Sequence, residues 1–310
     1  MKMLKRAGTA FTLAVCLAPG WPSTVRQKQR SPNAAVAAPA EMHAILLGTG
    51  FPRPFPDRAG PSTAIVVGDE VFLVDAGRGA TLRFAATGLL LSAIRAVFLT
   101  HLHSDHIDGL PDVFHSTWEF GRATPFELYG PEGTQSLADG MMKFYNADIH
   151  IRRDLTEHLP AAGATIETHI VHEGVVYEDA RVRVTAFNVD HRPVEPAFGY
   201  RFDCAGKIIV ISGDTRPSDN LIRHAKGADI LIHEAYLPEY FDRADNKQVA
   251  ATLKHYHTSA DEAGQVAEAA GVKMLVLTHL IPPDADQEFL DRAGKYFHGK
   301  IVVGRDLMKF

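Results

Sequence analysis

The sequence predicts an α/β protein in which two β-sheets pack face to face and helices cover them. Apolar segments of strand length alternate with helix-like segments, and hairpin-like strands are more frequent in the first half of the chain than in the second. A sandwich of sheets covered by helices accommodates both halves, because each sheet needs a second layer on which to bury its apolar face. The 310 residues, 46% of them hydrophobic, are enough for one large domain or two small ones.

Short apolar and β-branched runs mark the expected strands. In chain order these are Met42–Leu47, Thr63–Val67, Val71–Val74, Ala96–Leu99, Arg181–Phe187, Lys207–Ser212, Ile230–His233 and Lys273–Thr278. The expected helices are Gly79–Ala86, Leu110–Trp118, Pro131–Phe144, Ser218–His224 and Ser259–Ala270. The last helix has the clearest boundaries, because Ser259 and Glu262 match the capping-box pattern and Gly271 follows its final residue.

The first forty residues differ from the rest of the chain. Lys2, Lys5 and Arg6 precede an apolar stretch, residues 7–18, that is too short to span a bilayer, and small-residue cleavage sites such as Ala35-Val-Ala37 follow it. We therefore expect residues 1–40 to be a secretory signal and flexible leader. This would make the mature protein periplasmic or secreted, with no membrane span. The alternative is a flexible leader that is not cleaved.

Removal of the leader would make the protein strongly acidic, because its six basic residues have no acidic counterpart. Residues 41–310 contain 26 Lys and Arg against 37 Asp and Glu, a formal charge of −11. Such a balance opposes association with a polyanion. The composition therefore predicts a small-molecule substrate and no nucleic-acid partner.

The most informative segment is Thr100–Leu110, which reads THLHSDHIDGL and contains an HxHxDH pattern. Three imidazoles and a carboxylate within six positions are costly to bury unless each is hydrogen-bonded or bound to a metal. Zinc favours histidine nitrogens, and a carboxylate can serve a second ion. His101 and His103 alternate in an extended segment, so both side chains point the same way. Asp105 and His106 follow a turn and can serve a neighbouring ion, so the spacing predicts two adjacent metals.

Four further polar residues lie beyond apolar strands or open a helix, namely His191, Asp214, His257 and His279. Strand ends that share one edge of the sheets bring such side chains together on a rigid scaffold. We expect His191 to complete a three-histidine site with His101 and His103. Asp214 is expected to lie between two cations, because a carboxylate reduces their mutual repulsion.

Residues for a substrate pocket are less clearly marked. The candidates follow the metal motif or are tyrosines elsewhere, and they are His115, Trp118, Glu119, Phe120, Tyr145 and Tyr236. One interpretation is an aromatic wall that stacks on an aryl ester. The alternative is ordinary packing in the core and at the rim of the cleft.

An ordered set of motifs resembles the metallo-β-lactamase superfamily, and closely the branch that contains ribonuclease Z and the zinc arylsulfatases. The resemblance covers nearly all of residues 43–310, through Leu47-Gly-Thr-Gly-Phe-Pro, Leu73-Val-Asp-Ala-Gly, Thr100–Leu110, Ile211-Ser-Gly-Asp-Thr215, Ala228-Asp-Ile-Leu-Ile-His-Glu-Ala235 and His257-Thr-Ser-Ala260. It implies an αββα sandwich, a single hydrolase domain over residues 41–310. It also implies two zinc ions between the sheet edges, although iron or manganese can occupy similar sites.

The resemblance further implies a role for each site residue. His101, His103 and His191 would hold one ion, Asp105, His106 and His279 would hold the other, and Asp214 would bridge them. Asp75 would support the ligands from behind. Asp105 would also orient the attacking hydroxide. His233 and Glu234 would orient His257, which would donate a proton or a hydrogen bond to the substrate.

One departure from the family pattern favours a particular activity. Ribonuclease Z carries a long arm that grips tRNA, inserted between the Gly-Tyr-Arg and Ser-Gly-Asp segments, whereas here only five residues separate Arg201 from Lys207. The missing arm, the acidic charge and the leader together predict an arylsulfatase-like binuclear zinc hydrolase of small sulfate or phosphate esters. No tRNA partner is expected, and a homodimer is compatible with the resemblance. The alternatives are a phosphodiesterase, ribonuclease Z-like or specific for cyclic nucleotides, and a promiscuous β-lactamase or lactonase.

Overall fold

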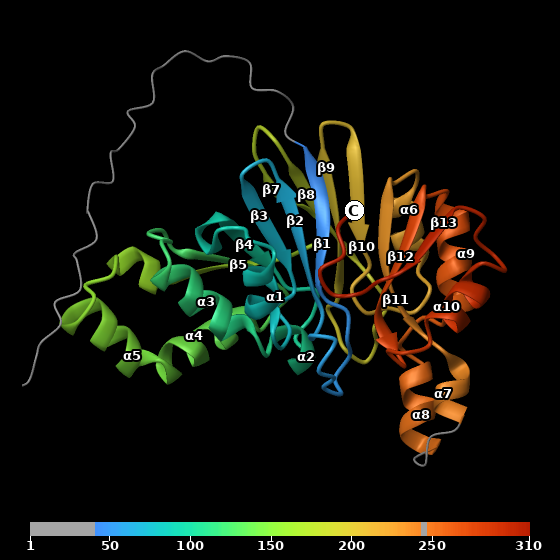
Figure 1. The fold of residues 1–310 in the computed structure, drawn as a ribbon, viewed down its shortest axis with the longest axis horizontal. Helices are drawn as coiled ribbons and strands as arrows, with labels where there is room; N and C mark the ends of the chain where they lie inside the picture. Colours follow the sequence, from blue (N-terminus) through green and yellow to red (C-terminus); the bar gives the residue numbers. More distant parts are fainter. Residues whose placement is uncertain (1–40, 243–246) are drawn as a thin grey trace, which may run out of the picture. The chain divides into compact units, whose positions relative to one another are not determined.

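A computed structural model of the chain describes residues 41–242 and 247–310, and the expected leader, residues 1–40, lies outside this part. Two mixed sheets pack face to face, and helices lie against their outer surfaces (Figure 1). One sheet has the strand order β1-β2-β3-β4-β5-β6, and the other has the order β13-β12-β11-β10-β9-β8-β7. This arrangement confirms the predicted αββα sandwich.

The first sheet changes from antiparallel to parallel pairing at β3. Its strands are β1 (Met42–Gly48), β2 (Ser62–Val67), β3 (Glu70–Val74), β4 (Ile94–Phe98), β5 (Phe126–Gly130) and β6 (Ile166–Ile170). Its outer face packs against α1 (Ala80–Ala86), α3 (Leu110–Glu119), α4 (Thr134–Phe144) and α5 (Asn146–His150). All six residues of β2 are buried, as expected for a strand covered on both faces.

The second sheet is antiparallel from β7 to β10 and parallel from β10 to β13. Its strands are β7 (Gly174–Glu178), β8 (Arg183–Asn188), β9 (Phe198–Cys204), β10 (Lys207–Ile211), β11 (Ile230–Tyr236), β12 (Met274–Ile281) and β13 (Lys300–Val303). Its outer face packs against α6 (Asp219–Ala225), α9 (Ala260–Ala270) and α10 (Asp286–Ala293). The capping box at Ser259 and the left-handed Gly271 that ends α9 are both present, as predicted.

The layer between the sheets is built from large aromatic side chains. Phe72 and Phe98 of the first sheet meet Tyr200 and Phe202 of the second, with the rings of Phe98 and Tyr200 5.4 Å apart and those of Phe72 and Phe202 6.3 Å apart. Burial of such rings contributes most of the stabilisation of a core of this kind. The sheets are thereby held in one register relative to each other, which fixes the positions of the loops at their edges.

Three short helices lie at the edge where β4, β8, β10 and β12 end. They are α2 (Ser104–Ile107), α7 (Pro238–Asp242) and α8 (Lys247–Lys254), and the last two extend beyond the ends of β11 and β12 (Figure 1). Two 3₁₀ turns, Leu91–Ala93 and Ala161–Ala164, and a π turn, Ile151–Leu155, complete the elements of the described part. Within the described ranges, no helix is long and apolar enough to cross a membrane.

Candidate metal centre

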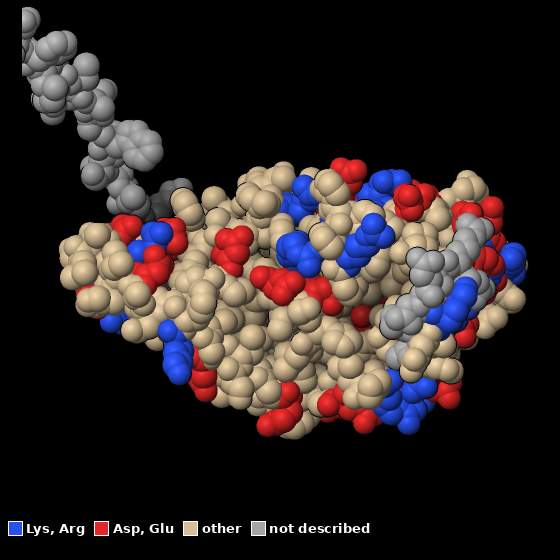
Figure 2. All heavy atoms as spheres, turned by 90° about the horizontal axis from the view of Figure 1, so that it is seen from below, with Lys and Arg blue, Asp and Glu red and all other residues tan. Residues whose placement is uncertain are grey.

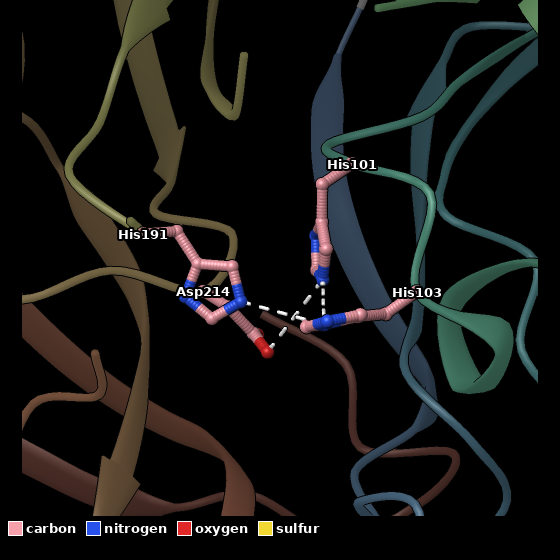
Figure 3. A group of neighbouring side chains, drawn as sticks. All are labelled: His101, His103, His191 and Asp214. Carbon is pink, nitrogen blue, oxygen red and sulfur yellow. Dashed lines mark hydrogen bonds and ion pairs between the residues drawn. The ribbon is translucent and has the colours of Figure 1, made fainter. Parts of the chain in front are cut away.

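Side chains from both sheets converge at this edge. His101 and His103 follow β4, whereas His191 and Asp214 follow β8 and β10 and approach from the opposite side (Figure 3). His103 Nδ1 lies 2.9 Å from His101 Nε2 and 3.4 Å from His191 Nε2. A tetrahedral zinc ion with bonds of about 2.0–2.1 Å separates its ligand atoms by roughly 3.3 Å. The three nitrogens are therefore spaced to share one ion.

A second group lies directly beside the first. Asp105 and His106 come from α2, and His279 comes from the end of β12, where its backbone has φ 47°. The Nε2 atom of His279 lies 3.4 Å from Oδ2 of both Asp105 and Asp214. His106 Nε2 lies 3.4 Å from Asp214 Oδ2. Because that oxygen is also 3.9 Å from His101 Nε2, Asp214 lies between the two groups, in the position predicted for a bridging ligand.

Asp75 holds the second group from behind. It follows β3, and its carboxylate accepts hydrogen bonds from Thr100 N at 2.8 Å, from Thr100 Oγ1 at 2.9 Å and from His106 Nδ1 at 2.8 Å. When a metal is bound, the last bond would keep the proton of His106 on Nδ1 and leave Nε2 with a lone pair for the metal. That Nε2 atom is buried and has no hydrogen-bond partner. A lone pair that faces carboxylates fits a divalent cation, which both kinds of group can ligate.

The imidazoles of the first group favour the neutral form, which is the form that binds metals. Burial lowers the pKa of His103, lowers that of His101 well below its usual value, and lowers that of His191 to about 4. His191 is further fixed by the contact of its Nδ1 with the backbone oxygen of Tyr256 at 2.9 Å. Each of these rings therefore favours the neutral form, in which one nitrogen has a lone pair for a metal.

Charges dominate the second group. Burial alone would lower the pKa of His106, but the carboxylates of Asp214 and Asp75 outweigh it and raise that pKa well above its usual value. Burial alone would raise the pKa of Asp214, but His279 and His106 hold it well below its usual value. Protonated imidazoles thus compensate the buried carboxylates when no metal is bound. Divalent ions can replace those protons.

His257 lies at the opening of this centre and is held by Glu234. The Nδ1 atom of His257 is 2.7 Å from Glu234 Oε2, and Glu234 Oε1 accepts from Thr215 N at 2.6 Å. This pairing fixes the ring and leaves its Nε2 edge unused. His233 neighbours Glu234 on β11 and is buried, with its Nδ1 2.7 Å from the backbone oxygen of Glu234. Glu234 therefore makes the orienting contact with His257.

A cavity of about 490 Å³ opens over the two groups. Five of the predicted site residues line it, namely His103, Asp105, Asp214, His257 and His279. The remaining lining is mostly aromatic or aliphatic, and consists of Phe51, Pro52, Arg53, Ser104, Tyr240, Phe241, Leu253, Tyr256 and Ile281. Seen from this side, the molecule has a broad uncharged area, with basic and acidic side chains interspersed around it (Figure 2).

The aromatic residues proposed from the sequence for this wall lie elsewhere. Trp118 is 1% exposed and donates its Nε1 proton to the backbone oxygen of Pro160 at 3.0 Å, so it is a core residue. His115 packs on Tyr145, with ring centroids 4.3 Å apart, on the helices that cover the first sheet. The residues after the metal motif thus follow the alternative, ordinary core and rim packing, because α3 leads away from the cavity. Tyr236 is also buried and packs behind the cavity, with its ring 5.3 Å from that of the lining residue Phe241.

Comparisons with known proteins agree with this geometry. Residues 70–280 match the family model of the beta-lactamase superfamily domain. Ribonuclease Z of Mycobacterium sp. strain KMS is 41% identical to this chain over 271 residues, which cover 84% of this chain and 93% of the relative. Ribonuclease Z of Mycobacterium bovis strain BCG Pasteur is 39% identical over 272 residues, which cover 84% of this chain and 95% of the relative. The structure of the short form of human tRNase Z has a TM-score of 0.64 at 25% identity, covering 86% of this chain and 98% of its own.

More distant structures share the fold. The metallo-beta-lactamase fold protein YhfI of Bacillus subtilis has a TM-score of 0.69 at 20% identity, covering 87% of this chain and 99% of its own. Zinc-bound PqqB of Methylobacterium extorquens has a TM-score of 0.60 at 16% identity, covering 86% and 99%. At these identities the likeness concerns the fold alone.

The relatives overturn two expectations, the arylsulfatase-like activity and the absence of tRNA as a partner. Proteins about 40% identical to this chain are named ribonuclease Z, and a similar solved structure is a tRNase Z. The argument from the missing arm fails because the ribonuclease Z of strain KMS has no room for a long arm either. The alignment of 271 residues takes up 84% of this chain and 93% of that relative, so little of the relative lies outside it. The argument from net charge fails because net charge describes the long-range field and not the contacts at one cleft.

The fold, the clusters of buried histidines and carboxylates and the matches in sequence all agree. The clusters support the binding of divalent metal at this edge of the sandwich. The chain belongs to the metallo-β-lactamase superfamily, in its ribonuclease Z branch, and is a metal-dependent hydrolase.

Proposed function

We propose that this protein is a zinc-dependent phosphodiesterase of the ribonuclease Z type that cleaves precursor tRNA. The observation that carries the proposal is the 41% identity to a ribonuclease Z over 84% of this chain. Zinc is the proposed metal because imidazole and carboxylate ligands suit it, and because PqqB, which has this fold, is zinc-bound.

We assign metal binding to seven residues, which are His101, His103, Asp105, His106, His191, Asp214 and His279. Two divalent ions held there would lower the pKa of a shared water and neutralise charge on the non-bridging oxygens of the phosphate. Asp105 faces the cavity and has the position to accept a hydrogen bond from the nucleophile, which would orient the attack. Asp214 contacts both groups and so keeps their relative positions fixed.

His257 is the proposed proton donor to the leaving oxygen. A ribose alkoxide is a poor leaving group and needs a proton as the phosphodiester bond breaks. Glu234 accepts the bond from His257 Nδ1 at 2.7 Å, which directs Nε2 towards the cavity and stabilises the ring when it carries a second proton. Burial lowers the pKa of His257, so the protonated ring gives up its proton readily.

The proposal is tested by incubating the zinc-loaded full chain with a precursor tRNA that carries a 3′ extension. We expect one cut that releases the extension, and at least a hundredfold loss of rate in Asp214→Ala, because this change removes the oxygen shared by both ligand groups. Asp139→Ala, on the exposed face of α4, is the matched control and is expected to keep full activity. Failure of a protein with both ions bound to cleave any precursor would refute the proposal.

A further inference from the structure

One wall of the metal cavity is aromatic and takes no part in holding the metal ligands. Phe51, Tyr240 and Tyr256 line this wall, and all three are partly exposed although their surroundings are largely apolar. They come from three separate segments, the loop after β1, helix α7 and the residue before His257. Large aromatic side chains are usually buried in a core, so their exposure inside a cavity indicates a surface kept available for a ligand.

Tyr256 lies closest to the chemistry. Its ring centroid is 5.0 Å from that of His191 and 4.7 Å from that of His257, so it contacts one proposed metal ligand and the proposed proton donor. Its backbone oxygen contacts His191 Nδ1 at 2.9 Å, which fixes the residue relative to the ligands. A flat group held against Tyr256 would therefore lie beside the scissile phosphate.

The loop after β1 extends this aromatic wall and adds a cation. The rings of Phe51 and Phe55 are 5.7 Å apart, and the guanidinium of Arg53 lies 5.5 Å from the centroid of Phe55. Arg53 is exposed and is the single Arg or Lys among the described residues that line the cavity. The carboxylates of the lining belong to Asp105 and Asp214, both of which face the metals. Away from the metals, the cavity suits a flat apolar ring joined to an anion.

We propose that Tyr256, with Phe51 and Tyr240, forms a stacking site for the base of one of the two nucleotides that flank the scissile phosphate, while Arg53 contacts a neighbouring phosphate. This inference rests on the proposed function. Bases stack on aromatic side chains irrespective of their sequence, because every base has a π face. A base that stacks on this wall inside the cavity must be unpaired. The site thus selects single-stranded RNA next to the cut.

The experiment compares three precursor RNAs cleaved by the zinc-loaded full chain. One RNA is intact, one lacks the base immediately before the cut, and one lacks the base immediately after it. For the wild type we expect kcat/KM to fall about tenfold to hundredfold with one of the two abasic RNAs. Tyr256→Ala should cause a similar loss on the intact RNA and less than about a twofold loss on that abasic RNA.

Two variants separate stacking from other effects of the substitution. Tyr256→Phe keeps the ring and should retain the wild-type rate. Tyr296→Ala removes a tyrosine that is 40% exposed and does not line the cavity, and it should change none of the three rates. Equal losses of Tyr256→Ala on intact and abasic RNA, or equal wild-type rates on all three RNAs, would overturn the stacking site while the proposed function stands. Absence of cleavage of the intact RNA would overturn both.

Discussion

Asp75 makes no contact with substrate, yet its charge is predicted to control metal binding by the second group. The change Asp75→Asn keeps the shape of the side chain. It also adds little backbone strain, because Asp75 has φ 60° and asparagine adopts this left-handed region readily. The substitution therefore removes an acceptor and leaves the fold of the loop in place.

The expected size of the effect follows from the contacts. Oδ2 of Asp75 receives both the hydroxyl of Thr100 at 2.9 Å and Nδ1 of His106 at 2.8 Å. An amide nitrogen at that position cannot accept either proton. His106 then favours the tautomer with its proton on Nε2, the atom that faces the carboxylates, and this competes with a metal. Loss of such a supporting contact costs tenfold to hundredfold in metal affinity, which is about 1.4–2.8 kcal/mol.

The assay is a zinc titration against a competing chelator, which measures the two sites as separate dissociation constants. We expect Asp75→Asn to weaken one site by that factor and to leave the other, held by His101, His103 and His191, within about threefold of the wild type. Asp108→Asn, two residues after His106 but paired with Arg78 at the surface, is the control and should change neither constant. Equal weakening of both sites, or no weakening, would refute the reasoning from the contacts of Asp75.

Three further predictions follow from the structure. Zinc uptake by the second group should release protons at pH 7 and weaken as the pH falls, because carboxylates outweigh burial and raise the pKa of His106 and His279. Burial lowers the pKa of His101, His103 and His191, so uptake by the first group should release fewer protons. Calorimetry in buffers of different ionisation enthalpy counts the protons, and equal release at both sites would contradict the assignment. Gly109→Ala should destabilise the fold by about 1–3 kcal/mol, because the added Cβ would lie 2.3 Å from the backbone oxygen of Gly77. Gly140→Ala on α4, where the added Cβ would have nothing within 4 Å, should stabilise the fold by about 0.5–1 kcal/mol. Urea unfolding of both variants measures the difference. The proposed cleavage of precursor tRNA predicts that residues 1–40 are retained, whereas the export expected from the sequence predicts removal near Ala37 or Ala40; N-terminal sequencing of the protein isolated from its host distinguishes the two.

The parts of the site that could be predicted from the sequence are those with distinctive chemistry. A run such as Thr100–Leu110 has few explanations, because buried imidazoles need partners. His191 and Asp214 each follow an apolar strand, His279 lies near the end of β12, and the structure brings all three to one edge. Five strands were not expected from the sequence, namely β5, β6, β7, β9 and β13, and three of them have weak patterns. In β9 a glycine, an arginine and an aspartate interrupt the apolar run, and β6 and β7 contain no fully buried residue.

The cavity wall could not be predicted for a different reason. Phe51, Tyr240 and Tyr256 are far apart in the sequence, and each resembles any other aromatic residue until the fold brings them together. Local signals existed for Tyr256, which directly precedes His257, and for Phe51, which lies in the Leu47-Gly-Thr-Gly-Phe-Pro motif. Trp118 and Tyr145 lie closer to the metal motif in sequence but pack on the outer face of the first sheet.

The error in the predicted activity has the same origin. The seven proposed ligands and His257 are common to hydrolases of sulfate esters and of phosphodiesters, since either centre needs a polarised water and a neutralised oxyanion. Substrate choice must therefore depend on groups outside this set, and neither net charge nor the length of the β9–β10 turn measures them. The groups that can set substrate choice are the side chains of the cavity wall. A cavity lined by Phe51, Tyr240 and Tyr256 and by one arginine can distinguish a nucleotide from a simple ester by stacking, so the variants of Tyr256 test whether substrate choice depends on this wall.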